Sequence, residues 1–178
     1  MIYVLLADGF EEIEGLAVVD ILRRAGLQVQ TVGVTGKTVV GSHQMPILTD
    51  VSIEETADDC QVLVLPGGMP GTKNLEESDA VQNLLDRVSE RNGLIAAICA
   101  APSVLGHRHM LEGKTATCYP GFEKDLYGAN VTANLVEHDG NIITGKGPGA
   151  AIPFALELVR TLVSEECAQK LFSAMQCR

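Results

Sequence analysis

The sequence contains no tryptophan, and aromatic residues occupy only 4% of its 178 positions. A folded core must therefore be built from Val, Leu, Ile and Ala. The five cysteines are odd in number, and no two of them form a CxxC pair. Their number and spacing argue against a disulfide-stabilised scaffold or a zinc ribbon, and they favour a reducing environment such as the cytoplasm.

Positive charge is scarce as well. The chain has 13 Lys and Arg against 23 Asp and Glu, a formal net charge of −10. An acidic surface repels phosphate groups, so we expect neither a nucleic acid nor an anionic membrane as a partner.

Long hydrophobic segments are also missing. The apolar run at 1–7 ends at Asp8 without a preceding basic region, and the run at 94–105 is interrupted by Pro102 and Ser103. Both are shorter than the ~20 residues that span a bilayer, and the first does not have the pattern of a secretory signal. We therefore expect a cytoplasmic protein.

The remaining composition is that of a folded domain. Hydrophobic residues make up 46% of the chain, charged residues 20%, and the mean hydropathy is +0.17. A chain of this length buries roughly two-thirds of the surface that its unfolded form exposes. We expect one domain over residues 1–178.

Apolar patterning alternates between strand-like and helix-like segments. It predicts strands over 2–7, 27–34, 62–65 and 94–98, a weaker strand over 114–118, and hairpins over 38–48 and 131–144. It predicts helices over 13–22, ended by Gly26, over 75–88, from Pro102, and around Phe154 and Ala168. Buried strands that alternate with helices indicate an α/β fold with a parallel sheet covered on both faces. In such sheets the binding site lies at the carboxyl ends of the strands, near the switch point.

Cys99 directly follows the predicted strand 94–98, where the chain turns into a helix. Ala97 and Ala101 stand where the nucleophile elbow GxSxG has its glycines. Such a turn would lift the sulfur to the top of the sheet, near a helix N-terminus that favours the thiolate. The alternative is a small, buried and unreactive cysteine.

Gly67 and Gly68 follow another predicted strand, 62–65. A glycine pair there lets backbone N–H groups face an incoming oxygen, so those of Gly68 and Ala100 could form an oxyanion hole. An ordinary glycine turn is the alternative.

Three glutamates begin the first helix. The helix dipole alone accounts for Glu11 and Glu12. Glu14 lies one turn further along and could point inward, where burial beside Cys99 would raise its pKa. It could then stay protonated and donate a hydrogen bond to the thiolate, or move a proton.

No histidine is an evident base for this cysteine. A helix that begins near Cys99 would carry His107 and His109 about 12 Å or more away. His43 and His138 fall in the two predicted hairpins. Surface positions are the favoured interpretation for all four.

Together these segments resemble the DJ-1/PfpI (ThiJ) family, and within it the DJ-1-like branch. The resemblance covers nearly the whole chain and is carried by DGFEEIE at 8–14, VLPGG at 64–68, LIAAICAAP at 94–102 and TGKGPG at 144–149. It implies a flavodoxin-like α/β sandwich with a mostly parallel central sheet and helices on both faces, commonly a homodimer. It implies no metal or other cofactor.

The resemblance also implies roles for individual residues. Cys99 would be the nucleophile and would be readily oxidised to sulfinic acid, with Glu14 as its hydrogen-bonding partner. Gly68 and Ala100 would supply the oxyanion N–H groups, and Gly67 is a further pocket candidate.

Two positions depart from the family pattern. Ala100 stands where the peptidase-like and amidase-like branches have histidine, which argues against a protease. Tyr119 stands where DJ-1-like proteins linked to glyoxalase chemistry often have histidine; a phenol can donate a hydrogen bond but is a poorer base at neutral pH. Cys118 beside it is a candidate for a second redox-active thiol, although packing at a strand end is the favoured alternative.

Three hypotheses follow. The first is a cofactor-independent enzyme acting on 2-oxoaldehydes or their early adducts, that is, a glyoxalase III that converts methylglyoxal to lactate, or a deglycase. The second is an oxidative-stress sensor or chaperone whose Cys99 forms a sulfinate. The third is a structural α/β domain with an unreactive Cys99.

Overall fold

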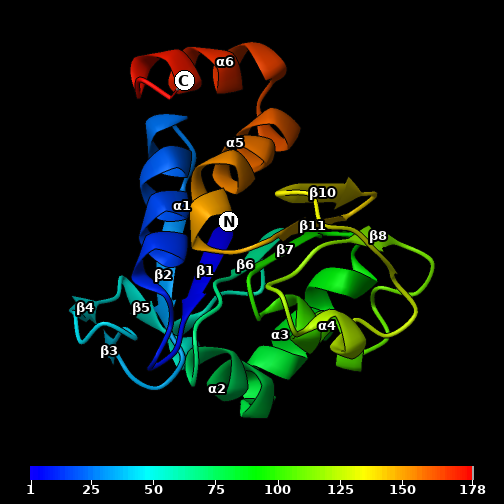
Figure 1. Ribbon diagram of the computed structural model, residues 1–178. Coiled ribbons are helices and arrows are strands. Elements are labelled where there is room, and N and C mark those ends of the chain that lie inside the picture. Colours follow the sequence, from blue (N-terminus) through cyan, green and yellow to red (C-terminus); the bar gives the residue numbers. More distant parts are fainter. Residues whose placement is uncertain (178) are drawn as a thin grey trace.

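The computed structural model describes residues 1–177 and is built on a seven-stranded sheet in the order β10-β11-β7-β6-β1-β2-β5 (Figure 1). Its strands are β1 Ile2–Leu6, β2 Val29–Gly33, β5 Val51–Ser52, β6 Val62–Leu65, β7 Leu94–Ile98, β10 Val136–Asp139 and β11 Ile142–Gly145. Neighbouring strands are parallel except β10 and β11, which form the predicted hairpin around Asp139 and Gly140. The mostly parallel α/β sheet predicted from the sequence is confirmed.

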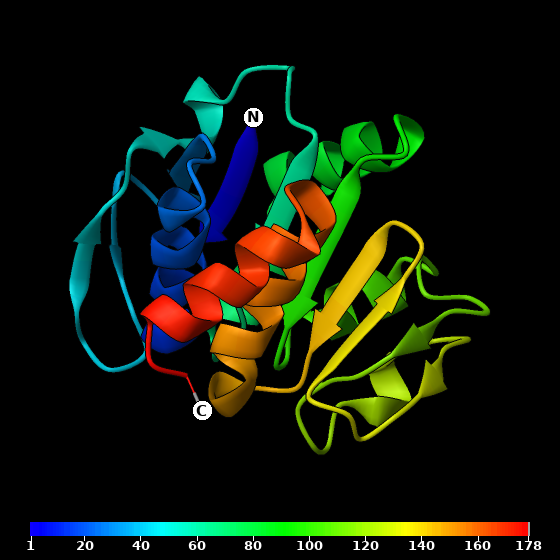
Figure 2. The same ribbon diagram turned by 90° about the horizontal axis from the view of Figure 1, so that it is seen from above.

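Helices cover both faces of this sheet (Figures 1 and 2). One face carries α1 Glu12–Arg24 and α5 Ala151–Leu162, with α6 Glu165–Ala174 packed on α5. The other face carries α3 Asp79–Glu90 and α4 Pro102–His107, with α2 Gly71–Glu77 beside them. The sheet therefore separates two hydrophobic cores.

Alternate residues of strand β1 contribute to the two different cores. Ile2, Val4 and Leu6 belong to the core under α1 and α5. Tyr3 and Leu5 belong to the core under α3 and α4. Successive side chains of a strand point to opposite faces, so a continuous apolar run is what a strand covered on both sides requires.

Some predicted elements differ from the observed ones. The apolar stripe over 75–88 is divided between two helices at Ser78, whose side chain accepts a hydrogen bond from the Val81 N–H and so caps α3. The strand over 114–118 shortens to β8 Thr115–Ala116, paired with β9 Asn130–Val131. The early hairpin is confirmed as β3 Thr38–Val40 and β4 Pro46–Leu48.

The strand order of the sheet indicates where the candidate site lies. From β1 the chain moves outward to β2, and it later returns to the other side of β1 as β6. The carboxyl ends of β1 and β6 thus flank the switch point where open α/β sheets bind ligands. The loops after β1, β6 and β7 are those that the sequence singled out. Within residues 1–177, no helix has the length and hydrophobicity needed to span a membrane.

Candidate active site

Cys99 occupies a strained turn between β7 and α4. Its φ of 67° lies in the left-handed region, which costs a residue with a side chain roughly 1–2 kcal/mol. Two hydrogen bonds of 2.8 Å hold the turn, from the Cys99 N–H to the Gly145 carbonyl and from the Tyr119 N–H to the Cys99 carbonyl. The predicted sharp turn at the cysteine is therefore present.

Glu14 lies in the first turn of α1 and is fully buried. Its Oε2 accepts a 2.8 Å hydrogen bond from the Gly67 N–H. Its Oε1 is also buried and has no hydrogen-bond partner of ordinary geometry within residues 1–177. Burial raises the pKa of Glu14 to about 7, against the lowering effects of the Gly67 N–H and of the Cys99 thiol. As predicted, Glu14 points inward and its pKa is raised.

Gly67 lies between the side chains of Cys99 and Glu14. A Cβ at this position would lie 2.6 Å from the Cys99 Cβ and 2.9 Å from Glu14 Oε2. Carbon atoms cannot approach that closely, so glycine is what allows the acid and the thiol to lie against the same loop.

Backbone N–H groups surround the sulfur. The N–H groups of Gly68 and Ala100 lie near the Cys99 thiol and oppose the rise of its pKa. Gly68 has a φ of +89°, and a Cβ there would lie 2.5 Å from the Glu11 nitrogen. The two donors named from the sequence therefore both lie near the sulfur, and their role as an oxyanion hole stays a prediction.

The protonation of the pair differs from the expectation. Burial raises the pKa of Cys99 to about 12, with the nearby Glu14 carboxylate adding to the rise and the Gly68 and Ala100 N–H groups opposing it. The expected helix effect is small because α4 has only six residues. At neutral pH the sulfur carries the proton, and Glu14, with the lower pKa, is the group positioned to receive it.

Tyr119 lies beside the site but is not shown to act in it. Its ring is half-exposed and covers Gly147, where a Cβ would lie 3.1 Å from Tyr119 Cδ2. It lines a cavity of about 240 Å³ together with Pro120, Leu135, Lys146, Gly147, Pro148, Gly149 and Ala150.

The histidines pair with carboxylates elsewhere. The pairs are His43 with Glu12, His107 with Glu76 and Asp125, His109 with Glu112, and His138 with Glu157. Cys118 is buried, and burial raises its pKa to about 11, with Glu123 and Asp125 adding to the rise. The packing interpretation of Cys118 thus fits better than a redox role.

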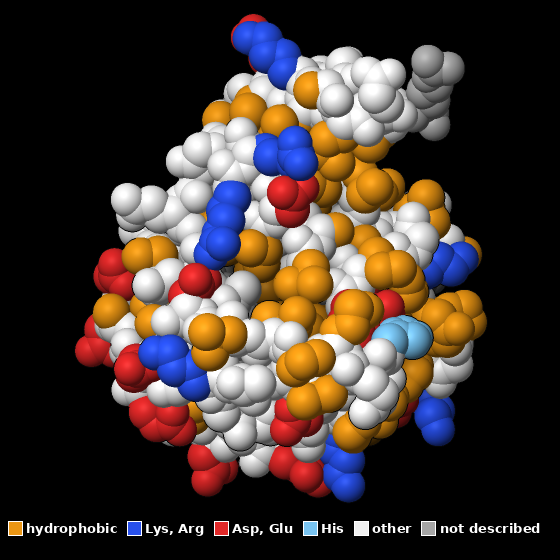
Figure 3. Space-filling view, turned by 90° about the vertical axis from the view of Figure 1, so that its left-hand side faces the viewer, with side chains coloured by type: hydrophobic (Ala, Val, Ile, Leu, Met, Phe, Trp, Pro, Cys, Tyr) orange, Lys and Arg blue, Asp and Glu red, His pale blue; other side chains and the backbone are white. Residues whose placement is uncertain are grey.

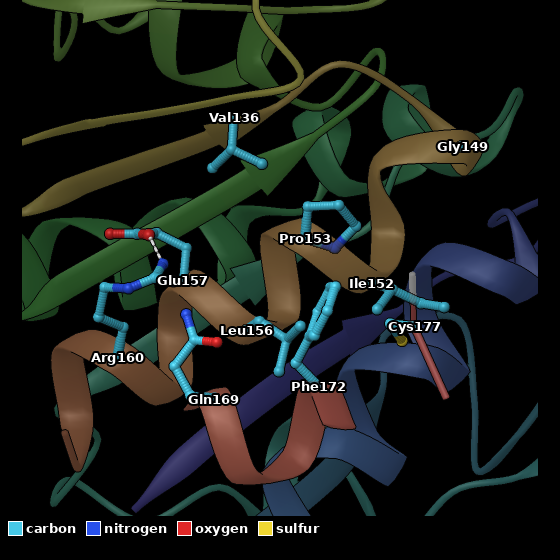
Figure 4. A pocket seen from close by; sticks show the side chains of 10 residues that line it. All are labelled: Val136, Gly149, Ile152, Pro153, Leu156, Glu157, Arg160, Gln169, Phe172 and Cys177. Carbon is cyan, nitrogen blue, oxygen red and sulfur yellow. Dashed lines mark hydrogen bonds and ion pairs between the residues drawn. The ribbon is translucent and has the colours of Figure 1, made fainter. Parts of the chain in front are cut away.

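A larger cavity of about 520 Å³ lies apart from Cys99 and Glu14, among α5, α6 and β10 (Figure 4). Its lining is mainly apolar, including Ile152, Pro153, Leu156 and Phe172, and the ion pair of Glu157 with Arg160 lies beside it. The acid and the thiol therefore do not open into the largest of the described cavities.

One polar cluster was not predicted from the sequence. Glu12 is buried, whereas the helix dipole alone was expected to account for it. It contacts Ser42 and His43 in the turn between β3 and β4. The two segments are about thirty residues apart, and no spacing rule links them.

The chain is similar to known proteins in both sequence and fold. The model of the DJ-1/PfpI family matches residues 1–161. Protein dj-1beta of Drosophila melanogaster is 41% identical over 172 residues, which cover 94% of this chain and 92% of that protein. The crystal structure of Drosophila melanogaster DJ-1beta superimposes with a TM-score of 0.93 at 39% identity, covering 99% of this chain and 97% of that one. Glutathione-independent glyoxalase DJR-1.2 of Caenorhabditis elegans is 35% identical over 169 residues, 93% of this chain and 89% of that protein.

Proposed function

Because this chain belongs to the DJ-1/PfpI family, and because its Cys99 and Glu14 meet at one buried glycine, we propose that it is a cofactor-independent glyoxalase. It would convert a 2-oxoaldehyde such as methylglyoxal to the 2-hydroxy acid. The observation that carries this proposal is the buried Glu14 carboxylate, which accepts a hydrogen bond from the Gly67 N–H and lies beside the Cys99 thiol. A glyoxalase among the relatives supports it.

In the first step the Cys99 sulfur attacks the aldehyde carbon while Glu14 takes the thiol proton. General-base removal of that proton compensates for the raised pKa of the thiol. The carbonyl π bond becomes an oxyanion, which the N–H groups of Gly68 and Ala100 stabilise. Returning the proton to that oxygen gives a hemithioacetal.

The second step moves hydrogen between adjacent carbons. Glu14 removes the proton from the former aldehyde carbon, giving an enediol, and a proton is returned to the neighbouring carbon. The product is a thioester of the 2-hydroxy acid. Water then cleaves the carbon–sulfur bond, releasing the acid and the Cys99 thiol. The net change is the addition of one water, so no external oxidant or reductant is needed.

The burial of the nucleophile bears on the choice of substrate. Only 8% of Cys99 is exposed. A three-carbon aldehyde can reach such a sulfur more easily than an adduct on a protein side chain, so we place small 2-oxoaldehydes ahead of glycated proteins. Comparing methylglyoxal with a glyoxal-modified peptide, by product analysis, tests this order; faster release from the peptide would identify a deglycase.

The decisive experiment compares methylglyoxal turnover by the natural protein and by Cys99→Ser, with lactate as the measured product. We expect a loss of at least about a hundredfold, because the hydroxyl is a much weaker nucleophile. Cys167→Ser, at a partly exposed cysteine on α6, is the matched control. Full activity in Cys99→Ser would exclude the mechanism.

Oxidation sensing is the second candidate. A solved structure of oxidized Toxoplasma gondii DJ-1 is 34% identical, with a TM-score of 0.91. Two equivalents of peroxide would convert the Cys99 thiol to a sulfinate with release of two waters, and the Gly68 and Ala100 N–H groups could bind its oxygens. The raised pKa of the thiol argues against rapid oxidation. A mass gain of two oxygens on Cys99 in mild peroxide, together with absent turnover, would favour this role.

We also propose that the protein acts as a cytoplasmic homodimer. Exposed hydrophobic side chains gather on the face shown in Figure 3. The exposed large hydrophobic residues of the chain include Ile13 on α1, Leu48 on β4, Ile152 on α5 and Phe172 on α6. Sedimentation equilibrium should give twice the mass of one chain, and Ile13→Glu should shift it toward the monomer. A monomeric natural protein would refute the proposal.

A further inference from the structure

The polar cluster that joins α1 to the β3–β4 hairpin takes no part in the reaction proposed above. Ser42 Oγ lies 3.2 Å from Glu11 Oε2, 3.1 Å from Glu12 Oε2 and 3.1 Å from His43 Nδ1. His43 Nδ1 lies 2.9 Å from Glu12 Oε2 and 3.6 Å from Glu11 Oε2. Ligand atoms of Glu11, Glu12 and His43 thus all lie within 4.8 Å of one another, and Ser42 Oγ contacts all three side chains.

These distances are close to those in a tetrahedral metal site, and most of them are slightly shorter. Zinc bonds to oxygen and nitrogen are about 2.0–2.2 Å long, so the ligand atoms of a tetrahedral ion lie roughly 3.3–3.6 Å apart. The five separations given above run from 2.9 to 3.6 Å. An ion at the centre would require only small outward movements of the side chains.

The charges of the cluster are unbalanced. The side chains of Glu11 and Glu12 are only 12% and 3% exposed. Within residues 1–177, their ion pairs are all with His43, whose ring is 65% exposed and carries at most one positive charge. Two buried carboxyl groups therefore share one exposed imidazole, and a divalent cation would balance the charge of both carboxylates.

The backbone holds the ligands in place. The Ser42 N–H donates to the Phe10 carbonyl at 2.8 Å, and the His43 N–H donates to Glu12 Oε1 at 2.8 Å. A Cβ at Gly41 would lie 2.2 Å from Glu12 Oε1, so glycine leaves the space that this carboxylate fills. A preorganised set of ligands with one exposed member gives an ion both a site and a path into it.

We propose that Glu11, Glu12, Ser42 and His43 form a Zn²⁺ site, with Oε2 of each glutamate, Nδ1 of His43 and Oγ of Ser42 as ligands. Zinc accepts imidazole and carboxylate ligands in a tetrahedron, whereas Mg²⁺ and Ca²⁺ prefer six or more oxygens. On binding, the metal replaces the hydrogen on Nδ1, and His43 keeps a hydrogen on Nε2.

The test is a Zn²⁺ titration of the full-length, metal-free protein against a chromophoric chelator. We expect one ion per chain, and a loss of affinity of at least about tenfold in His43→Ala and in Glu11→Gln. His109→Ala is the matched control, because His109 is also exposed and also pairs with a glutamate, Glu112 at 2.8 Å. Its affinity should equal that of the natural protein. Circular dichroism establishes that each variant is folded.

A parallel titration with Co²⁺ distinguishes this site from the cysteines. Tetrahedral oxygen and nitrogen ligands give visible d–d bands without the near-ultraviolet charge-transfer band of a thiolate. A thiolate band, binding unaffected by His43→Ala, or failure to bind Zn²⁺ would each overturn the proposal.

Discussion

The Gly67 N–H donates a 2.8 Å hydrogen bond to Oε2 of Glu14 and thereby attaches the loop after β6 to the first turn of α1. The bond fixes one carboxylate oxygen and leaves the other, Oε1, buried and free to exchange a proton. Such a fixed carboxylate is what a general base needs, because its geometry must be set before the reaction begins.

The first prediction concerns the pH dependence of turnover. Burial raises the pKa of Glu14 to about 7, and the carboxylate is the active form, so kcat/KM should rise with pH and level off above about 7. From pH 5.5 to 8 the ionised fraction grows about thirtyfold. Glu14→Gln should lose at least about a hundredfold in activity and show no such rise, whereas the surface variant Glu90→Gln should keep the profile. An unchanged profile in Glu14→Gln would contradict the assignment.

The Glu14 carboxyl group should also make the free energy of unfolding depend on pH. Its pKa rises from 4.5 to about 7 on folding, so the folded state holds the proton more tightly than the unfolded state. The associated stability is fully present below about pH 4.5 and is lost as pH rises through about 7. The shift corresponds to about 3 kcal/mol. Urea unfolding at pH 5 and pH 8 should show this loss in the natural protein but not in Glu14→Gln; equal losses in both would refute it.

Gly67→Ala should disable the site. The added methyl would lie 2.6 Å from the Cys99 Cβ and 2.9 Å from Glu14 Oε2, so acid and thiol must move apart. We expect kcat to fall at least about a hundredfold, since misplacement by about 1 Å has that effect, with about 1–3 kcal/mol lost in unfolding free energy. Gly149→Ala is the control, because its Cβ would meet nothing within 4 Å. Normal turnover by folded Gly67→Ala would show that the contact is unimportant.

Tyr119→Phe should have only a small effect on turnover. The ring is half-exposed, and the described hydrogen bonds of residues 1–177 engage its backbone N–H rather than its hydroxyl. Removing the hydroxyl should change kcat/KM by no more than about threefold. A hundredfold loss in steady-state assays would instead make the phenol a proton donor to the substrate, in the place of the family's histidine.

Much of the fold was predictable because the central strands are buried on both sides. The uninterrupted apolar runs of β1, β6 and β7 are typical of strands in a parallel sheet that helices cover on each face. The division of the helical stripe at Ser78 was not predicted, because Leu75 and the apolar residues from Val81 onward were interpreted as one stripe.

The candidate site was predictable in its members but not in its electrostatics. Cys99 and Gly67 follow buried strands, and Glu14 lies in the first turn of a helix, so parallel topology brings the three residues together. The pKa values depend on how deeply the sequence-distant loops bury the pair, which local patterns do not encode. Glu12 shows the same limit, since the hairpin that covers it lies about thirty residues away.

The left-handed backbone at Cys99 also constrains how this protein can change. With a φ of 67°, the position would accept glycine with less strain than any other residue, a relief of roughly 1 kcal/mol. Glycine has no sulfur, so the substitution that suits the backbone best removes the nucleophile. Stability and reactivity are therefore opposed at a single residue. Directed evolution for thermal tolerance alone would favour glycine at this position, and the resulting protein would be inactive.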